Sequence, residues 1–326
     1  MHMSDALVST PVALTGVAIA VGLLATAGKE MKEKDSTSII PLMGVLGAFI
    51  FAAQMINFAI PATGSSGHIV GGVLLAAFLG PWAAFVTLAS VLIIQCLVFA
   101  DGGLLALGCN LINMGAMTTL VAYPLIYRPI VGASTSGWRI TLGAVCACIV
   151  GLELGAFMVS VETMLSGVSA LKWSQFWSIM ALIHLPIGLV EGIATAAVLV
   201  FVARVRPDLL SSHGSRPSKR SVKRAVVWFA VATLVIGGGL VWFASSNPDG
   251  LEWSIQQLTG TDELEQESPT VISTLAGKIS NKTSIMPDYD NPLAGIFGAI
   301  IVLSIVWCIS AMLIKRPHAK ESRAKD

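Results

Sequence analysis

The stretch HIVGGVLLAAFLGPWAAFVTLASVLIIQCLVFA, residues 68–100, decides how the chain is threaded through a membrane. It is longer than the roughly 20 apolar residues that one helical crossing needs. Pro81 interrupts it, because proline lacks a backbone donor and disfavours helical geometry in the preceding residue, here Gly80. The stretch therefore crosses either once, with a break, or twice, with one short crossing and one of ordinary length.

The rest of the chain is similarly apolar. Of its 326 residues, 55% are hydrophobic and 12% are charged, with a mean hydropathy of +0.79 and a formal net charge of +1. A soluble core cannot account for so much apolar material, which indicates an all-α polytopic membrane protein. Further stretches long enough to cross lie at residues 11–28, 39–60, 104–127, 140–163, 176–203, 225–244 and 293–314.

The distribution of basic residues favours two crossings over one at residues 68–100. They gather after the first apolar stretch, at Arg128 and Arg139, within residues 204–224, and in the tail after residue 314. Cytoplasmic loops carry an excess of Lys and Arg, and these groups share one side only if residues 68–100 cross twice. We therefore expect nine crossings, an external amino terminus and a cytoplasmic carboxyl terminus.

The chain is predicted to divide into three parts. Residues 1–203 form a seven-helix bundle, residues 204–224 a basic cytoplasmic linker, and residues 225–326 a two-helix hairpin. The external loop of the hairpin, residues 245–292, carries eight carboxylates against two lysines. Five cysteines lie in apolar runs and are interpreted as buried small hydrophobic residues rather than disulfides or metal ligands. They are Cys96, Cys109, Cys146, Cys148 and Cys308.

The chain opens MHMSDAL, and its histidine at position 2 suggests a metal chelate. The free amine of Met1, the backbone nitrogen of His2 and its ring Nδ1 close a five-membered and a six-membered ring on one ion. Three nitrogens in a plane suit Ni(II), Cu(II) or Co(II), whereas Mg(II) prefers oxygen ligands. His68, in a glycine- and serine-rich loop on the same predicted face, is the candidate fourth ligand. Each histidine alone is more often a solvated terminal or loop residue.

Polar residues inside or beside the predicted crossings allow two interpretations. Four of them either orient the two histidines, as metal-bound imidazoles usually require, or join helices by hydrogen bonds. They are Asn57, Asp101, Asn110 and Asn113. Ionisable residues within a membrane suggest function, but we expect His184, Glu191 and Glu153 to pair with one another structurally. Small residues four apart in the first crossing permit close helix packing, within the chain or with a membrane partner. They are Gly16 with Ala20 and Ala18 with Gly22.

Several of these segments together resemble one family. MHMSDAL, SGHIVGGVLLAAFLGPWAAF, QCLVFADGGLLALGCNLINM and HLPIGLVEG are similar to the CbiM/NikM family, the substrate-binding membrane subunits of energy-coupling factor transporters for cobalt and nickel. The resemblance covers residues 1–203. NPDGLEWS, residues 247–254, resembles the PDGLE hallmark of the small CbiN/NikN partner, here fused to the same chain. Met3, Ser4 and Ala6 depart from the family pattern, while Asp5 is kept.

The resemblance implies a metal held by the amine and amide nitrogens of Met1 and His2, the His2 ring and His68. It implies Ni(II) or Co(II) as transported substrate, with the fusion favouring nickel, and no tightly bound organic cofactor. The implied partners are a transmembrane coupling subunit and ATP-binding subunits, and no nucleic acid. The implied location is a bacterial or archaeal cell membrane. We expect the hairpin to matter more for transport than for metal binding.

Two other functions compete with metal transport. The chain has no GxxxxGK[ST] motif, so ATP hydrolysis is expected in separate subunits and the chain itself is not expected to be an enzyme. An intramembrane metalloenzyme is disfavoured because no HExxH motif occurs. A membrane metal sensor or receptor that signals without transport stays open.

Overall fold

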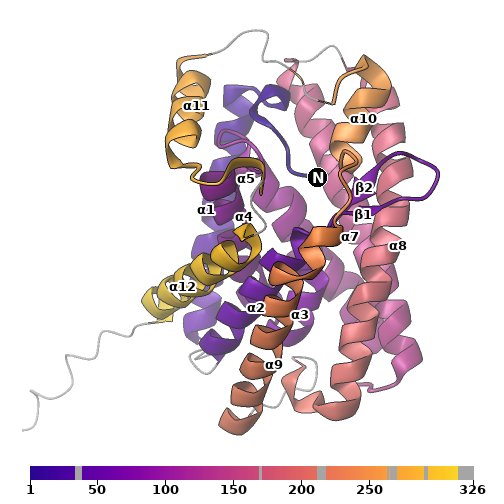
Figure 1. Cartoon of the computed structure of the whole chain (residues 1–326), viewed down its shortest axis with the longest axis vertical. Helices are drawn as coiled ribbons and strands as arrows, with labels where there is room; N and C mark the ends of the chain where they lie inside the picture. Colours follow the sequence, from indigo (N-terminus) through magenta and orange to yellow (C-terminus); the bar gives the residue numbers. More distant parts are fainter. Residues whose placement is uncertain are drawn as a thin grey trace, which may run out of the picture.

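Helices make up most of the fold, as expected of a chain that must satisfy its backbone hydrogen bonds without water. The computed structural model describes residues 1–33, 39–168, 171–210, 218–262, 264, 270–289 and 293–314. A short antiparallel pair, β1 (Phe58–Ala59) with β2 (Ser66–Gly67), interrupts the helices. The prediction of an all-α polytopic membrane protein is confirmed (Figure 1).

Among the described residues, six helices are long and apolar enough to cross a membrane. They are α1 (Thr10–Glu33), α4 (Pro81–Phe99), the segment Leu107–Val131, α7 (Gly137–Ser166), α8 (Trp173–Val205) and the part Arg220–Gly238 of α9 (Lys219–Gly238). The segment Leu107–Val131 consists of α5 (Leu107–Asn110), the π-helical η3 (Leu111–Tyr127) and α6 (Arg128–Val131). Two helices with shorter apolar parts are α2 (Ile40–Gln54) and α12 (Ala294–Ile314).

The predicted break inside residues 68–100 is confirmed. α3 (Gly72–Leu79) is followed by Gly80, whose φ of 78° and ψ of 166° are not helical, and α4 begins at Pro81. Proline suits the first turn of a helix, where its missing N–H would have no partner. The eight residues of α3 rise about 12 Å, well short of about 30 Å of hydrocarbon. The count of nine crossings therefore stays a prediction.

The carboxyl-terminal helices pack directly against the bundle. α9 and α12 contact each other, and both contact α2. The polar stretch between them contains α10 (Gly250–Thr259) and α11 (Val271–Thr283), which lie toward the upper end in Figure 1, with α10 packed on α8. Parts of the predicted linker, basic clusters and acidic loop lie outside the described residues. These parts are residues 34–38, 211–217, 263, 265–269, 290–292 and 315–326.

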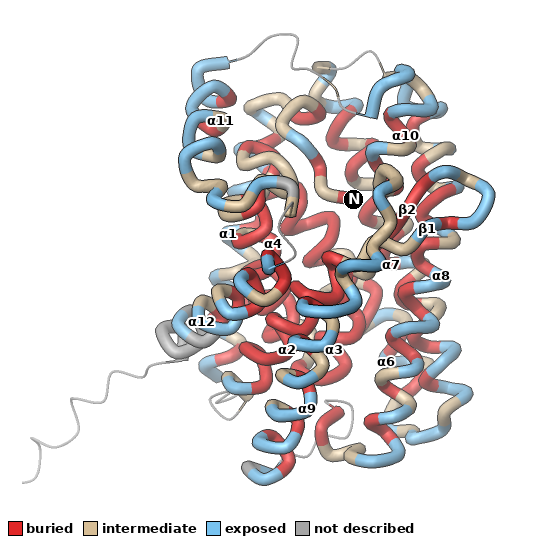
Figure 2. The backbone as a smooth tube through the Cα atoms, viewed as in Figure 1, coloured by how far each residue is buried: buried red, intermediate tan, exposed pale blue. Residues whose placement is uncertain are grey.

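α1 buries one face and leaves the other exposed (Figure 2). Its buried small residues, Gly16 and Ala20, face the bundle, and a Cβ on Gly16 would lie 2.9 Å from the Cys109 Sγ. Ala18 and Gly22 are exposed, beside large apolar side chains. The first pair of small residues therefore packs within the chain.

The interpretation of the cysteines is correct for three of them. Cys96, Cys109 and Cys148 are buried, and all five cysteines are free. Cys146 is half-buried and Cys308 is exposed, so the prediction of burial is wrong for these two. An apolar run predicts that a residue lies in a helix, but the helix face decides whether it meets protein or the surroundings.

The contact between α1 and α5 predicts that Gly108→Ala destabilises the fold. A Cβ on Gly108 would meet the backbone of α1, at the Val17 nitrogen and 2.5 Å from the Gly16 carbonyl carbon. Overpacking of this kind typically costs about 1–3 kcal/mol, so the midpoint of thermal unfolding in detergent should fall. Gly22→Ala is the control, since a Cβ on Gly22 meets nothing within 4 Å. Equal midpoints for the two variants would contradict the close approach.

Candidate metal centre

The amino terminus lies in the interior of the molecule rather than fraying at its surface (Figure 1). Met1 is 5% exposed and Met3 is fully buried. The Asn110 side chain accepts a hydrogen bond from the Met3 N–H at 2.8 Å and donates one to the Met3 carbonyl at 3.1 Å. The Asp5 carboxylate accepts from the Ala106 N–H at 3.0 Å. Chain ends are usually poorly ordered unless tied down, and these bonds fix the register of the first residues.

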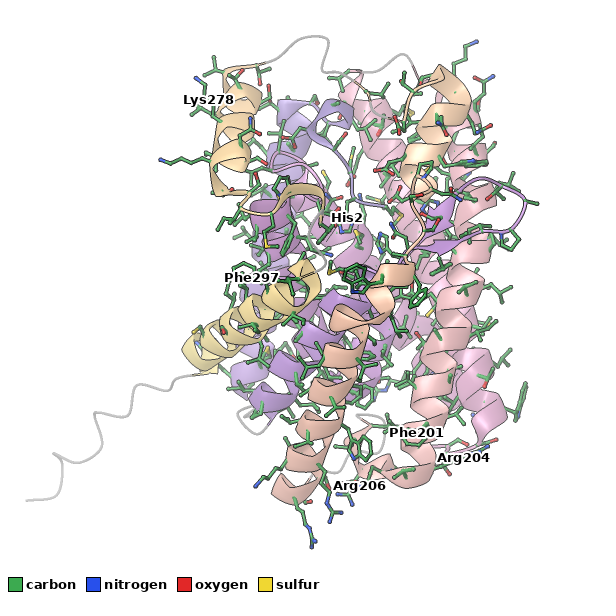
Figure 3. The ribbon with its side chains drawn as sticks, viewed as in Figure 1. His2, Phe201, Arg204, Arg206, Lys278 and Phe297 are labelled. Atoms are coloured by element: carbon green, nitrogen blue, oxygen red, sulfur yellow. The ribbon has the colours of Figure 1, made fainter. Side chains whose placement is uncertain are left out.

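His2 lies inside the protein, whereas Lys278, Arg204 and Arg206 lie toward its two ends (Figure 3). The His2 Nδ1 is 3.0 Å from Asp101 Oδ1, and Asp101 Oδ2 accepts a hydrogen bond from the Tyr289 hydroxyl at 2.7 Å. Among the described residues, the buried His2 Nε2 has no hydrogen-bond partner. Burial lowers the pKa of His2, although Asp101 opposes the shift, which favours the neutral ring that a metal requires.

His68 follows β2 and faces the amino terminus. Its Nε2 lies 3.4 Å from the Met1 amine nitrogen, and its ring stacks on the His2 ring with centroids 5.2 Å apart. Its Nδ1 is 3.2 Å from the Ile69 carbonyl oxygen. Because a carbonyl only accepts, Nδ1 carries the proton and Nε2 offers its lone pair toward Met1. Burial, and then the positive charge of the amine, lowers the pKa of His68 to about 3.

The loop that carries His68 is held from α8. The two carboxylate oxygens of Glu191 accept from the consecutive N–H groups of Val70 and Gly71, each at 2.9 Å. The Gln54 amide donates to the Val70 carbonyl at 2.8 Å and accepts from the Gln95 amide at 2.8 Å. This chain of hydrogen bonds fixes the backbone immediately after His68.

The expected pairing of His184, Glu191 and Glu153 with one another is wrong. Glu191 binds the loop described above, and His184 Nδ1 donates to the Met180 carbonyl at 2.8 Å. Glu153 Oε1 is buried with no hydrogen-bond partner among the described residues. Spacing on one helix face suggested the pairing, but Glu191 binds backbone N–H groups of another segment and His184 binds a carbonyl of its own helix.

The four residues proposed to orient the histidines have different partners. Asp101 contacts His2, and Asn110 contacts the backbone of Met3. Asn57 borders the cavity beside the terminus, and its carbonyl accepts from the Ser245 N–H at 2.7 Å. The Asn113 amide donates instead to Glu162 at 2.7 Å, so it does not orient either histidine directly.

An open cavity of about 650 Å³ lies beside the two histidines and is also lined by residues of the carboxyl-terminal part. Asp249, in the NPDGLEWS motif, forms an ion pair with the Met1 amine. Burial alone would raise the pKa of Asp249, but the positive amine and then His68 hold it below its ordinary value. Sequence reasoning missed Asp249 and Tyr289 as neighbours of the terminus, although the motif containing Asp249 had been recognised.

Side chains alone do not make a metal cluster here. In the part of the chain that the structure describes, no three His, Cys, Asp or Glu residues gather in a way that could hold an ion. Two imidazoles and a free amine do converge. A metal at this centre would therefore need the amine and main-chain nitrogen in addition to the rings.

Known proteins match both parts of the chain. Residues 2–209 match the model of the CbiM family, described as the cobalt uptake substrate-specific transmembrane region, and residues 223–315 match the model of the PDGLE domain. The putative fused nickel transport protein NikMN of Archaeoglobus fulgidus is 31% identical, covering 95% of this chain and 98% of the relative. The fused nickel transport protein NikMN of Rhodobacter capsulatus is 28% identical, covering 79% of this chain and 77% of the relative. A crystal structure of a transition metal transporter has a TM-score of 0.55 and 30% identity, covering 63% of this chain and 93% of that chain.

The Glu191 contacts predict a graded response to substitution. Glu191→Ala leaves two buried N–H groups unpaired, at about 1–3 kcal/mol for each, whereas Glu191→Gln keeps one acceptor oxygen and should lose less. Glu153→Ala is the matched control, because Glu153 Oε1 has no hydrogen-bond partner among the described residues. Thermal unfolding and hydrogen exchange at Val70 and Gly71 measure the effect. The assignment is contradicted if Glu191→Ala changes neither more than Glu153→Ala does.

Proposed function

The chain belongs to the CbiM family of cobalt-uptake transmembrane proteins, and on this premise we propose that it is the substrate-binding membrane component of an energy-coupling factor transporter. Its substrate in this proposal is Ni(II), with Co(II) as the alternative. Relatives along most of the chain are named as fused nickel transport proteins, which supports this substrate class.

The proposed ligands are four nitrogens: the Met1 amine, the His2 backbone nitrogen, the His2 Nδ1 and the His68 Nε2. One observation carries the proposal: a buried amino terminus whose amine nitrogen lies 3.4 Å from His68 Nε2, with the two imidazoles stacked. Chelation through His2 Nδ1 would replace its hydrogen bond to Asp101, with the ring proton carried on Nε2 instead. The Met1 ammonium and the His2 amide would each release one proton to water, so that their nitrogens could bind the ion. Such in-plane nitrogen ligation suits Ni(II).

The energy for uptake comes from other subunits in this proposal. The sequence contains no GxxxxGK[ST] motif, and a coupling subunit with ATP-binding subunits would complete the transporter. The amino terminus and the cavity face the outside, and the carboxyl tail faces the cytoplasm. A metal sensor that binds but does not transport is the competing function, and uptake of labelled nickel with and without the partner subunits separates the two.

The proposal predicts that His68→Ala abolishes high-affinity metal binding without unfolding the protein. The variant removes one of four metal bonds, and the affinity for Ni(II) should fall by more than the roughly 10–100-fold that loss of an outer hydrogen-bond partner typically costs. Uptake should fall in parallel. His318→Ala, which also removes one histidine, should bind and transport as the wild type does. Wild-type affinity in the purified, folded His68→Ala protein removes His68 from the site.

A further inference from the structure

We infer that Asp249 of the carboxyl-terminal part positions the amino-terminal amine for metal binding, so that both parts of the chain build the metal centre. The inference rests on the proposed function and deepens it. Asp249 acts here as a positioning residue: it contacts a ligand group rather than the metal.

The two oxygens of Asp249 have separate partners. Oδ1 caps α10 by accepting from the N–H groups of Leu251 at 2.7 Å and Glu252 at 3.0 Å. Oδ2 pairs with the Met1 amine. Serine or threonine can cap a helix equally well, but either would lack both the second oxygen and the charge. An aspartate at this position therefore serves a purpose that capping does not explain.

The backbone around Asp249 is fixed to the loop that carries His68. The Pro248 carbonyl accepts from the Ser66 N–H at 2.8 Å, and the Asn247 carbonyl accepts from the Ser66 hydroxyl at 2.7 Å. The indole N–H of Trp253 donates to the Thr63 carbonyl at 3.0 Å. These bonds fix the residues on both sides of Asp249 to the loop, while Asp249 itself contacts the terminus.

The approach of this segment to α8 also demands a glycine. A Cβ on Gly250 would lie 3.0 Å from Cε1 of His184 and 2.9 Å from Cδ1 of Ile187. A larger residue would push the turn outward and carry Asp249 away from the amine. The glycine of the motif is thus explained by its contact with α8, and the aspartate by its contact with the amine.

Burial increases the effect of losing the ion pair between Asp249 and the Met1 amine. The side chains of Met1 and Asp249 are only 4% and 15% exposed. A buried charge whose partner is removed is strongly unfavourable, so an amine without Asp249 would leave the interior and lose its register with His68. The binding ion would then have to bring the terminus back, and affinity would fall.

This contact revises one expectation from the sequence. Loss of the hairpin was expected to impair transport more than it impairs metal binding. Because Asp249 reaches the amine, removal of residues after 224 should weaken binding itself.

The test compares Asp249→Asn with Glu252→Gln in the purified full-length protein, by equilibrium titration with Ni(II). Asparagine keeps an oxygen that can cap α10 but loses the charge that pairs with the amine. Glutamine at position 252 removes a neighbouring charge, while Glu252 contacts the Asp249 N–H rather than the amine. We expect Asp249→Asn to bind at least about tenfold more weakly, the scale of an outer-partner loss, and Glu252→Gln to stay within about twofold of the wild type.

Asp249→Ser provides a second variant that keeps the cap without a carboxylate, and it should reproduce the loss. Circular dichroism spectra that match that of Glu252→Gln show that the helices are intact, whereas the thermal unfolding midpoints of both Asp249 variants should fall because the buried amine loses its partner. The inference is overturned if Asp249→Asn or Asp249→Ser binds Ni(II) with wild-type affinity, or if Glu252→Gln loses as much affinity as they do. Either result leaves the proposed function intact. Failure of the wild-type protein to bind Ni(II) or Co(II) contradicts the proposed function as well.

Discussion

A positively charged amino terminus buried inside an apolar bundle needs a compensating charge, and the ion pair with Asp249 supplies it. Removing one partner of a buried pair typically costs about 3–5 kcal/mol, so this contact joins residues 248 positions apart in the sequence. The carboxyl-terminal helices then become part of the same structural unit as the bundle. A second constraint fixes the register of the first residues, since the Asn110 side chain binds both the N–H and the carbonyl of Met3.

The bundle fixes the two histidines in different ways. His68 lies on a loop whose backbone is bound by Glu191 and Gln54. His2 is bound by Asp101 through Nδ1, the proposed ligand atom, so this hydrogen bond must be exchanged when a metal binds. A loop that is already fixed does not have to be ordered on binding, which removes one of the costs of association. The low pKa of His68 keeps its nitrogen unprotonated at neutral pH. The His68 side of the proposed centre is therefore preorganised for a cation that takes nitrogen ligands.

Patterns along the chain predicted the fold class and the helix break at Pro81, because apolar length and proline geometry act locally. They also selected His2 and His68, which the structure brings together, although their role as ligands stays a prediction. The partners of Glu191 were out of reach, since two backbone N–H groups leave no pattern in the side chains. The contact between Asp249 and Met1 depends on how α10 meets the loop before His68, which no local rule specifies. Spacing on one helix gave the wrong partner for His184, whose Nδ1 donates instead to the Met180 carbonyl one turn earlier in α8.

The most direct test of the account is the affinity for Ni(II) of a protein with extra residues ahead of Met1, verified as uncleaved by mass spectrometry. Every side chain is retained in that protein, but the amine is converted to an amide and its place beside Asp249 and His68 is taken by the added chain. The account predicts that high-affinity binding is lost, while the same protein with its tag at the carboxyl terminus binds normally. Unchanged affinity in the extended protein would contradict a metal centre built on the free amino terminus.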